Sequence, residues 1–516
     1  MRTDKLSFSD KCLLWAVACV GCLYIGAAAL GWPQAGARLV ASSGHAEAVS
    51  GHTEPSGHEP ALSHPPYWMV APFAILLVAI AVLPLVPWTS HWWESNLHRF
   101  YVASALAVVT LVYYLLWYEG AIRAHWPVEH SVLAEPGRLN FSLVSAVLAN
   151  AILSEYIPFI VLLLTLYTIS GGIRIEGDLP AHPLTNSLFL VVTAVLASFI
   201  GTTGAAMLLV RPLLETNRER RYVKHTVVFY IFVACNCGGC LLPLGDPPLF
   251  LGYLLGVPFT WTLKLWPEWL FVNGILIALY YVWDRFWFYP HERPQDLARD
   301  ETQVRRLTFS GVWPNAWLLI GVILTVGLLD PSKPVPGTDW RPWPYLREVV
   351  QLGLIGLSLL WGKPAVRRAN NFNYSAILEV AALFFGIFIC MQAPLQILNV
   401  RGPSLGLETP VQFYFATGIL SSVLDNAPTY VVFFETAKSL GGATAGLPLR
   451  ENLLYGVSLG AVFGGAMTYI GNGPNFMVKS IAEKSGVPMP SFFGYVVYSC
   501  GILLPVLIAT AVLFLR

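Results

Sequence analysis

Long apolar runs alternate with short polar stretches along most of this 516-residue chain. A run of about 17–25 apolar residues is long enough to cross the hydrocarbon core of a bilayer as a helix. By this criterion the sequence predicts about eleven crossings. They lie near residues 12–32, 67–88, 101–122, 141–170, 225–256, 267–288, 311–329, 346–361, 374–398, 453–478 and 491–515.

Two further apolar stretches, 187–211 and 411–436, are interrupted by SFIGTTG and SVLDNAPT. We interpret each as a re-entrant hairpin that enters and leaves the membrane on the same side, because polar backbone at membrane depth needs protein or a water-filled cavity around it. The predicted fold class is an all-α polytopic membrane protein with about 11 transmembrane helices and two re-entrant hairpins.

One sequence skeleton occurs twice. GGCLLPLGDPPLF at 238–250 returns 226 residues later as GGAMTYIGNGPNF at 464–476. Proline breaks the interior of a helix but suits its first turn. We therefore interpret each copy as a broken helix whose second half begins at Pro247 or Pro474, with the free N–H groups and positive dipole end of that half inside the membrane.

The duplication extends beyond this skeleton, since Glu155 and Glu379, like Ser198 and Ser422, are 224 residues apart. Five predicted crossings separate the two hairpins, an odd number, so the halves are predicted to be inverted. Broken helices in inverted repeats mark the binding site of secondary transporters. The predicted division is as follows: peripheral helices at 1–140, which include a His-rich external loop at 33–66; a first repeat at 141–290; linker and scaffold helices at 291–372; and a second repeat at 373–516.

Composition agrees with a membrane protein, since 55% of residues are hydrophobic, 12% are charged and the mean hydropathy is +0.59. A net charge of +1 with no basic domain predicts no nucleic-acid partner, and the absence of a Walker A motif argues against ATP drive within this chain. With the N-terminus in the cytoplasm, about 20 of the 31 Lys and Arg fall on cytoplasmic segments, as the positive-inside rule requires. We expect a multi-pass protein of the inner (cytoplasmic) membrane. The loop at 33–66, with His45, His52, His58 and His64, is predicted to be a disordered linker; the alternative is loose metal binding or pH sensing.

Two intramembrane acids are the leading candidates for chemistry. Asp425 lies in the second hairpin, followed by Asn426, and Asp246 lies at the first helix break. A carboxylate at such a depth costs a few kcal/mol unless it is paired, hydrated, protonated or bound to a cation, so it can exchange a proton for a metal ion. The alternative for both residues is an ordinary helix cap. The first hairpin tip has Gly201, Thr202 and Thr203 and no acid.

The other candidates supply neutral oxygens, amides or further acids. The predicted substrate-binding residues are Gly201, Thr202, Thr203, Asn426, Pro428, Thr429, Pro247, Asn472 and Asn475. The ion- or proton-coupling candidates are Asp425, Asp246, Glu155 and Glu379, with an interfacial position as the alternative for the two glutamates. A sodium ion would be held by Asp425, Asn426 and Thr203. No cofactor is expected beyond transported sodium ions and protons. The expected partners are membrane lipid and small inorganic ions or a small carboxylate, and a homodimer is among the expected assemblies.

At these motifs the sequence resembles the ion-transporter superfamily, which includes NhaD-like sodium/proton antiporters, citrate and dicarboxylate transporters and arsenite permeases. SSVLDNAPT looks like the hairpin motif of the antiporter and arsenite branches. GTTGAAMLLVRPL looks like the hairpin of the dicarboxylate branch, and LPLGDPPLF like the shared G-D-P-P-N break with Leu249 in place of the Asn. The resemblance, over about residues 141–515, implies a substrate and ion site between the hairpin tips and the helix breaks.

These features predict a secondary active transporter rather than an enzyme. The leading hypothesis is sodium/proton antiport by alternating access. The second is a sodium- or proton-coupled citrate or dicarboxylate transporter, and the third is an arsenite permease. A non-transporting membrane subunit is disfavoured, because a scaffold has no need for paired helix breaks that carry acids.

Overall fold

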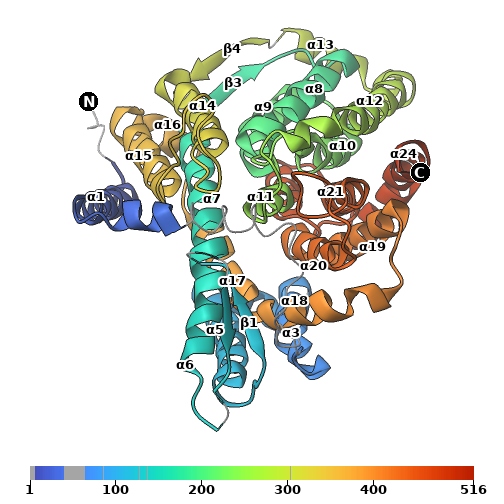
Figure 1. Ribbon diagram of the computed structural model, residues 1–516. Coiled ribbons are helices and arrows are strands. Elements are labelled where there is room, and N and C mark those ends of the chain that lie inside the picture. The colour runs from blue at the N-terminus through green and yellow to red at the C-terminus, as the bar shows by residue number, and fades with distance from the viewer. Residues whose placement is uncertain are drawn as a thin grey trace. The chain divides into compact units, whose positions relative to one another are not determined.

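The computed structural model describes residues 6–39 and 64–515, except the single positions 85, 127, 129, 136 and 303. Helices dominate this part of the chain, and its strands form two short antiparallel pairs (Figure 1). The prediction of a helical membrane protein is confirmed at this level. The predicted His-rich loop lies mostly outside the described residues, with His45, His52 and His58 among those not described.

Six described helices are long and apolar enough to cross a membrane, or up to eight when each of two bent helix pairs counts as one span. The six are Phe8–Ala29, Asn96–Leu116, Phe141–Ser170, Pro183–Ile200, Trp261–His291 and Phe492–Phe514. Five of them coincide with predicted crossings, and the bent pairs fall on two more, 67–88 and 374–398. The total of about eleven stays a prediction, since several predicted crossings are shorter helices or contain a break.

The chain forms two compact units. Unit 1 comprises Met1–Thr168, Trp317–Ala365 and Asn371–Ser404, and unit 2 comprises Ile169–Ala316, Val366–Asn370 and Leu405–Arg516. Each unit therefore gathers segments from distant parts of the sequence. The predicted division into four consecutive segments was based on the sequence repeat. The two units group residues by their contacts, so they do not test that division, which stays a prediction.

Unit 1 is organised on α5 (Asn96–Leu116), which packs along α17 (Ser375–Cys390). Gly386 allows the close approach, because a Cβ there would lie 2.7 Å from the Cβ of Ala103. The other elements wholly inside unit 1 are α1 (Phe8–Ala29), η1 (Tyr67–Val70), α3 (Ala71–Val82), α4 (Pro87–Trp93), β1 (Ala121–Ala124), β2 (His130–Leu133), α6 (Phe141–Leu148), the π-helix η2 (Ala149–Tyr156), α15 (Leu346–Trp361) and α18 (Gln392–Arg401). The 3-10 helix η7 (Gly402–Leu405) begins in unit 1 and ends one residue past its boundary.

Three helices carry the chain between the units: α7 (Ile157–Ser170), α14 (Val312–Leu328) and α16 (Pro364–Ala369).

Unit 2 contains two helical hairpins at the predicted places. In the first, α8 (Pro183–Ile200) meets α9 (Thr202–Thr216) at Gly201, whose φ of +80° suits a residue without a Cβ. In the second, α19 (Pro410–Val423) is followed by Leu424, Asp425 and then α20 (Asn426–Ser439). The predicted hairpin tips are thus helix boundaries.

The two broken helices also occur in unit 2. The first consists of α10 (Lys224–Ala234), the 3-10 turn η3 (Cys237–Cys240) and α11 (Pro247–Leu254). The second consists of α21 (Glu451–Gly464), the 3-10 turn η8 (Gly465–Met467) and α22 (Gly473–Lys484). The predicted breaks are confirmed, with a proline at the first or second position of each second half.

The remaining elements of unit 2 surround these four. They are β3 (Arg174–Asp178), which pairs antiparallel with β4 (Arg305–Ser310), η4 (Trp261–Leu265), α12 (Trp266–Trp283), the π-helix η5 (Asp284–Phe288), η6 (Tyr289–His291), α13 (Pro294–Thr302), α23 (Phe492–Tyr498), the π-helix η9 (Ser499–Leu503) and α24 (Leu504–Phe514).

The glycines of the repeated skeleton have a packing role. A Cβ on Gly245 would lie 2.1 Å from the backbone oxygen of Gly239, and a Cβ on Gly471 would lie 2.6 Å from that of Gly465. The second glycine of GG and the glycine of G-x-x-P therefore touch through their backbones at both breaks. This contact explains why the two glycines recur at the same spacing.

Candidate functional site

The two broken helices restart on matching polar residues. Asp246 precedes α11 and Asn472 precedes α22, and their backbones are alike, with φ/ψ of −141°/141° and −152°/139°. Neither side chain caps its own helix. Asp246 thus occupies the N-cap position of α11 without a side-chain cap hydrogen bond, and both side chains are available to reach other segments.

The Asp246 carboxylate is 1% exposed and accepts three side-chain hydrogen bonds. Thr202 donates Oγ1 to Oδ1 at 2.9 Å, and Asn426 donates Nδ2 to Oδ2 at 2.7 Å. Asn472 donates Nδ2 to Oδ1 at 3.2 Å. Thr202 and Asn426 are the first helical residues of α9 and α20, so both hairpin tips and both helix breaks meet at one carboxylate.

A second layer of amides supports this arrangement. Asn472 Nδ2 also lies within hydrogen-bond distance of the Cys235 carbonyl at 2.9 Å and of Asn236 Oδ1 at 3.2 Å. Asn236 in turn donates Nδ2 to Asn475 Oδ1 at 2.8 Å, and Asn475 donates to the Gly465 carbonyl at 2.8 Å. These asparagines tie the first helix break to the second.

The negative charge of the Asp246 carboxylate is not matched by a positively charged side chain among its described partners. The side-chain hydrogen bonds to the Asp246 carboxylate all come from neutral groups, with no Lys or Arg among these described partners. The carboxylate lies at the starts of α9, α11, α20 and α22, where the positive ends of the helix dipoles offset its negative charge. Asn426 Oδ1 is buried and has no hydrogen-bond partner among the described residues. A carboxylate beside a free amide oxygen offers hard ligands for an alkali cation or an acceptor for a proton.

Asp425 differs from Asp246. Its carboxylate accepts from the Ala427 amide at 3.1 Å, so the capping interpretation holds for this residue. Its carbonyl accepts from Thr429 Oγ1 at 2.9 Å. The other predicted hairpin residues stand beside it or on the first tip: Pro428 is buried in α20, and Thr203 is half-buried in α9.

The predicted glutamates belong to unit 1, whereas the other predicted site residues belong to unit 2. Glu155 lies in the π-helix η2. Glu379 pairs with Arg99 at 2.9 Å, between its carboxylate and the Nη1 atom. Their role in coupling stays a prediction.

Sequence reasoning missed Asn236, which is fully buried and joins the two breaks. The signal was a lone asparagine between two cysteines in the stretch CNCGG, which lies in an otherwise apolar segment. It also paired Ser198 with Ser422. In the structure Ser198 Oγ donates to the Gly238 carbonyl at 2.6 Å and Ser422 Oγ to the Ile419 carbonyl at 2.7 Å, so the two serines do not make equivalent hydrogen bonds.

Comparison with known proteins identifies the family of the chain. A family model described as "Putative citrate transport" matches residues 62–515, which is most of the chain. The chain belongs to this family. Among individual proteins, a 46 kDa membrane protein of Mycobacterium leprae is 25% identical to the chain over 324 residues. The match covers 60% of this chain and 71% of that protein. Uncharacterised transporters of Mycobacterium bovis and Mycobacterium tuberculosis are each 24% identical over 323 residues, again 60% of this chain and 71% of theirs. Family membership identifies a membrane transporter and leaves the transported ion or molecule open.

Proposed function

We propose that this family member is a cation-coupled secondary transporter in which Asp246 is the coupling group. The observation that carries the proposal is the convergence of two hairpin tips and two helix breaks on one buried carboxylate. A buried charge is tolerated only when it is paired, hydrated, protonated or bound to a cation. Asp246 would therefore exchange a proton or sodium ion as the site opens to either side.

We further propose a small carboxylate such as citrate as the cargo. The family description supports this choice, and so do the four helix starts, since helix N-termini favour anions. With Asp246 neutralised by a bound cation, the positive ends of α9, α11, α20 and α22 would be free to hold the substrate carboxylate. Cation and anion would then bind together, which is symport.

Sodium/proton antiport is the second candidate. It is favoured by the neutral surroundings of Asp246, because a polycarboxylate is usually matched by Arg or Lys and neither is among the described hydrogen-bond partners of Asp246. In this case Asn426 Oδ1, Thr203 and Asp425 would complete a sodium site, and sodium and proton would compete for it.

For the architecture we propose about eleven crossings, two re-entrant hairpins and inverted repeats that work by alternating access. The protein would lie in the inner (cytoplasmic) membrane with a cytoplasmic N-terminus, as the distribution of Lys and Arg indicates.

The test uses purified protein in proteoliposomes. Labelled citrate uptake is measured under an inward sodium gradient and under a pH gradient, and internal pH is recorded when sodium is added without citrate. Gradient-driven citrate uptake supports the carrier, whereas sodium-driven proton movement without citrate supports the antiporter. Asp339→Asn, at an exposed residue, is the control for Asp246→Asn. Wild-type protein that is silent in all three assays would contradict both candidates.

A further inference from the structure

Three carboxylates from separate segments of unit 2 come together away from Asp246. Asp178 ends β3, Glu219 follows α9, and Asp300 lies in α13. One carboxylate oxygen from each lies within 4.8 Å of the others. Glu219 lies 41 positions after Asp178, and Asp300 lies 81 positions after Glu219. The fold, rather than a local sequence motif, therefore brings the three residues together.

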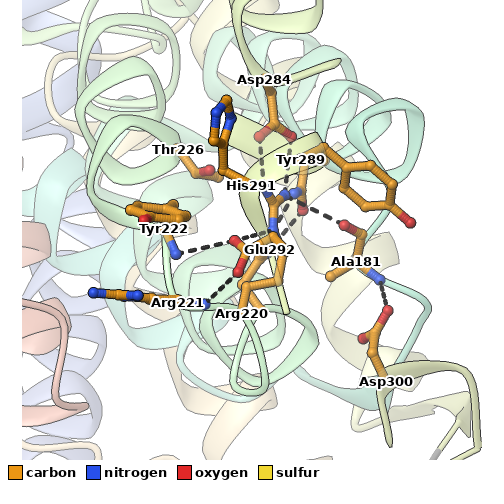
Figure 2. A network of polar contacts seen from close by, with 12 residues as sticks. Ala181, Arg220, Arg221, Tyr222, Thr226, Asp284, Tyr289, His291, Glu292 and Asp300 are labelled. Atoms are coloured by element: carbon orange, nitrogen blue, oxygen red, sulfur yellow. Dashed lines mark hydrogen bonds and ion pairs between the residues drawn. The ribbon is translucent and has the colours of Figure 1, made fainter. Parts of the chain in front are cut away.

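Some carboxylate oxygens of this cluster have no hydrogen-bond donor among the described residues. Asp300 is 4% exposed, and its Oδ2 accepts from the Ala181 amide at 2.8 Å (Figure 2). Its Oδ1 is buried without a hydrogen-bond partner among the described residues, and so is Glu219 Oε2. A buried carboxylate oxygen without a donor is costly, so its presence in two of the three acids points to a missing ligand.

Positive charge near the cluster is sparse. Arg305 Nη2 lies 3.8 Å from Asp178 Oδ2, but it also contacts Glu215. Arg220, which lies close by in Figure 2, is held by Asp284 at 2.5 Å and by Glu292 at 3.3 Å. Apart from Arg305 at Asp178, no Lys or Arg forms an ion pair with these three acids among the described residues, so their charges repel one another.

We propose that Asp178, Glu219 and Asp300 bind a hard divalent cation such as Ca²⁺. All ligands are carboxylate oxygens, the donors that Ca²⁺, Mg²⁺ and Mn²⁺ prefer. Ca²⁺ binds oxygen at about 2.3–2.6 Å and Mg²⁺ at about 2.0–2.1 Å, and a spacing of at most 4.8 Å between the three oxygens admits either ion.

Such an ion would have a defined mechanical effect. Glu219 follows the end of α9, whereas Thr202 at the start of the same helix contacts Asp246. The cation would tie that end of the helix to β3 and α13. It would brace the first hairpin at the end opposite to the Asp246 contact.

The test is equilibrium binding of ⁴⁵Ca²⁺ to the purified full-length protein in detergent after treatment with a chelator. We expect Glu219→Gln to weaken binding at one site by about tenfold or more, since even indirect supports of a metal are worth about 10–100-fold. Asp300→Asn should do the same while keeping an acceptor for the Ala181 amide. Glu301→Gln, the next residue in α13 and exposed, is the matched control.

The design separates this site from the transport site. Asp246→Asn should leave ⁴⁵Ca²⁺ binding unchanged, so failure of the proposed transport function would not affect the result. Glu219 has an unpaired buried oxygen, so its replacement by Gln is a mild change, and size-exclusion chromatography checks that the variant is folded. Equal binding by wild type, Glu219→Gln and Glu301→Gln would overturn the proposal, as would loss of binding in Asp246→Asn alone.

Discussion

The glycine contact at the first helix break gives the sharpest stability prediction. In Gly245→Ala the new Cβ would lie 2.1 Å from the Gly239 oxygen and 3.0 Å from the Ser198 Cα. Both neighbours are backbone atoms, so neither can rotate away as a flexible side chain would. Overpacking of this kind costs about 1–3 kcal/mol.

That cost sets the expected shift. One kcal/mol moves the melting temperature of a domain of 150–250 residues by about 2–4 °C, so Gly245→Ala should lower it by roughly 2–12 °C. Differential scanning fluorimetry of the purified protein in detergent measures the apparent melting temperature directly.

Gly274→Ala is the matched control, because a Cβ at this position in α12 meets nothing within 4 Å. It should leave the melting temperature unchanged or raise it slightly, since Ala favours a helix by about 0.5–1 kcal/mol over Gly. If Gly245→Ala melted at the same temperature as Gly274→Ala, the backbone contact between the two motif glycines would not exist as described.

Three other substitutions have defined outcomes. Thr202→Val removes a donor to Asp246 and should reduce transport about tenfold or more, because a hydrogen bond to a charged group is worth about 1.5–3 kcal/mol. Thr338→Val, at an exposed position, should have little effect, and equal losses in the two variants would argue against the contact. Asn236→Ala removes the donor to the buried Asn475 Oδ1, at a cost of about 1–3 kcal/mol. It should therefore lower the melting temperature more than Asn452→Ala, a change at an exposed position. Arg220→Met should destabilise the protein by about 3–5 kcal/mol, because it leaves the buried Asp284 carboxylate without its Arg partner. Arg218→Met should not destabilise it, since the Arg218 side chain is 72% exposed. Similar yields and melting temperatures for the two variants would contradict the buried ion pair.

Much of unit 2 was predictable because its signals are local. Proline and glycine fix helix boundaries through their backbone limits alone, so the breaks at Pro247 and Pro474 and the tips at Gly201 and Asp425 could be located from sequence. The repeat then linked the segments that carry them.

Contacts between distant segments could not be predicted in this way. The sequence ranked Asp425 first, because an acid in a hairpin is conspicuous, yet its side chain caps α20 while Asp246 takes the three side-chain donors. Which acid caps its own helix depends on side-chain direction, and the residue pattern does not encode that direction. The meeting of Asp178, Glu219 and Asp300 depends likewise on the packing of β3, α9 and α13.

The most direct test of the central claim is to compare exchange with gradient-driven transport in Asp246→Asn proteoliposomes. The labelled cargo is the one identified in the uptake assays, citrate or ²²Na⁺. Loss of the coupling group should abolish accumulation against a gradient while exchange of labelled for unlabelled cargo continues. Accumulation at the wild-type level in Asp246→Asn would contradict the assignment of Asp246 as the coupling group.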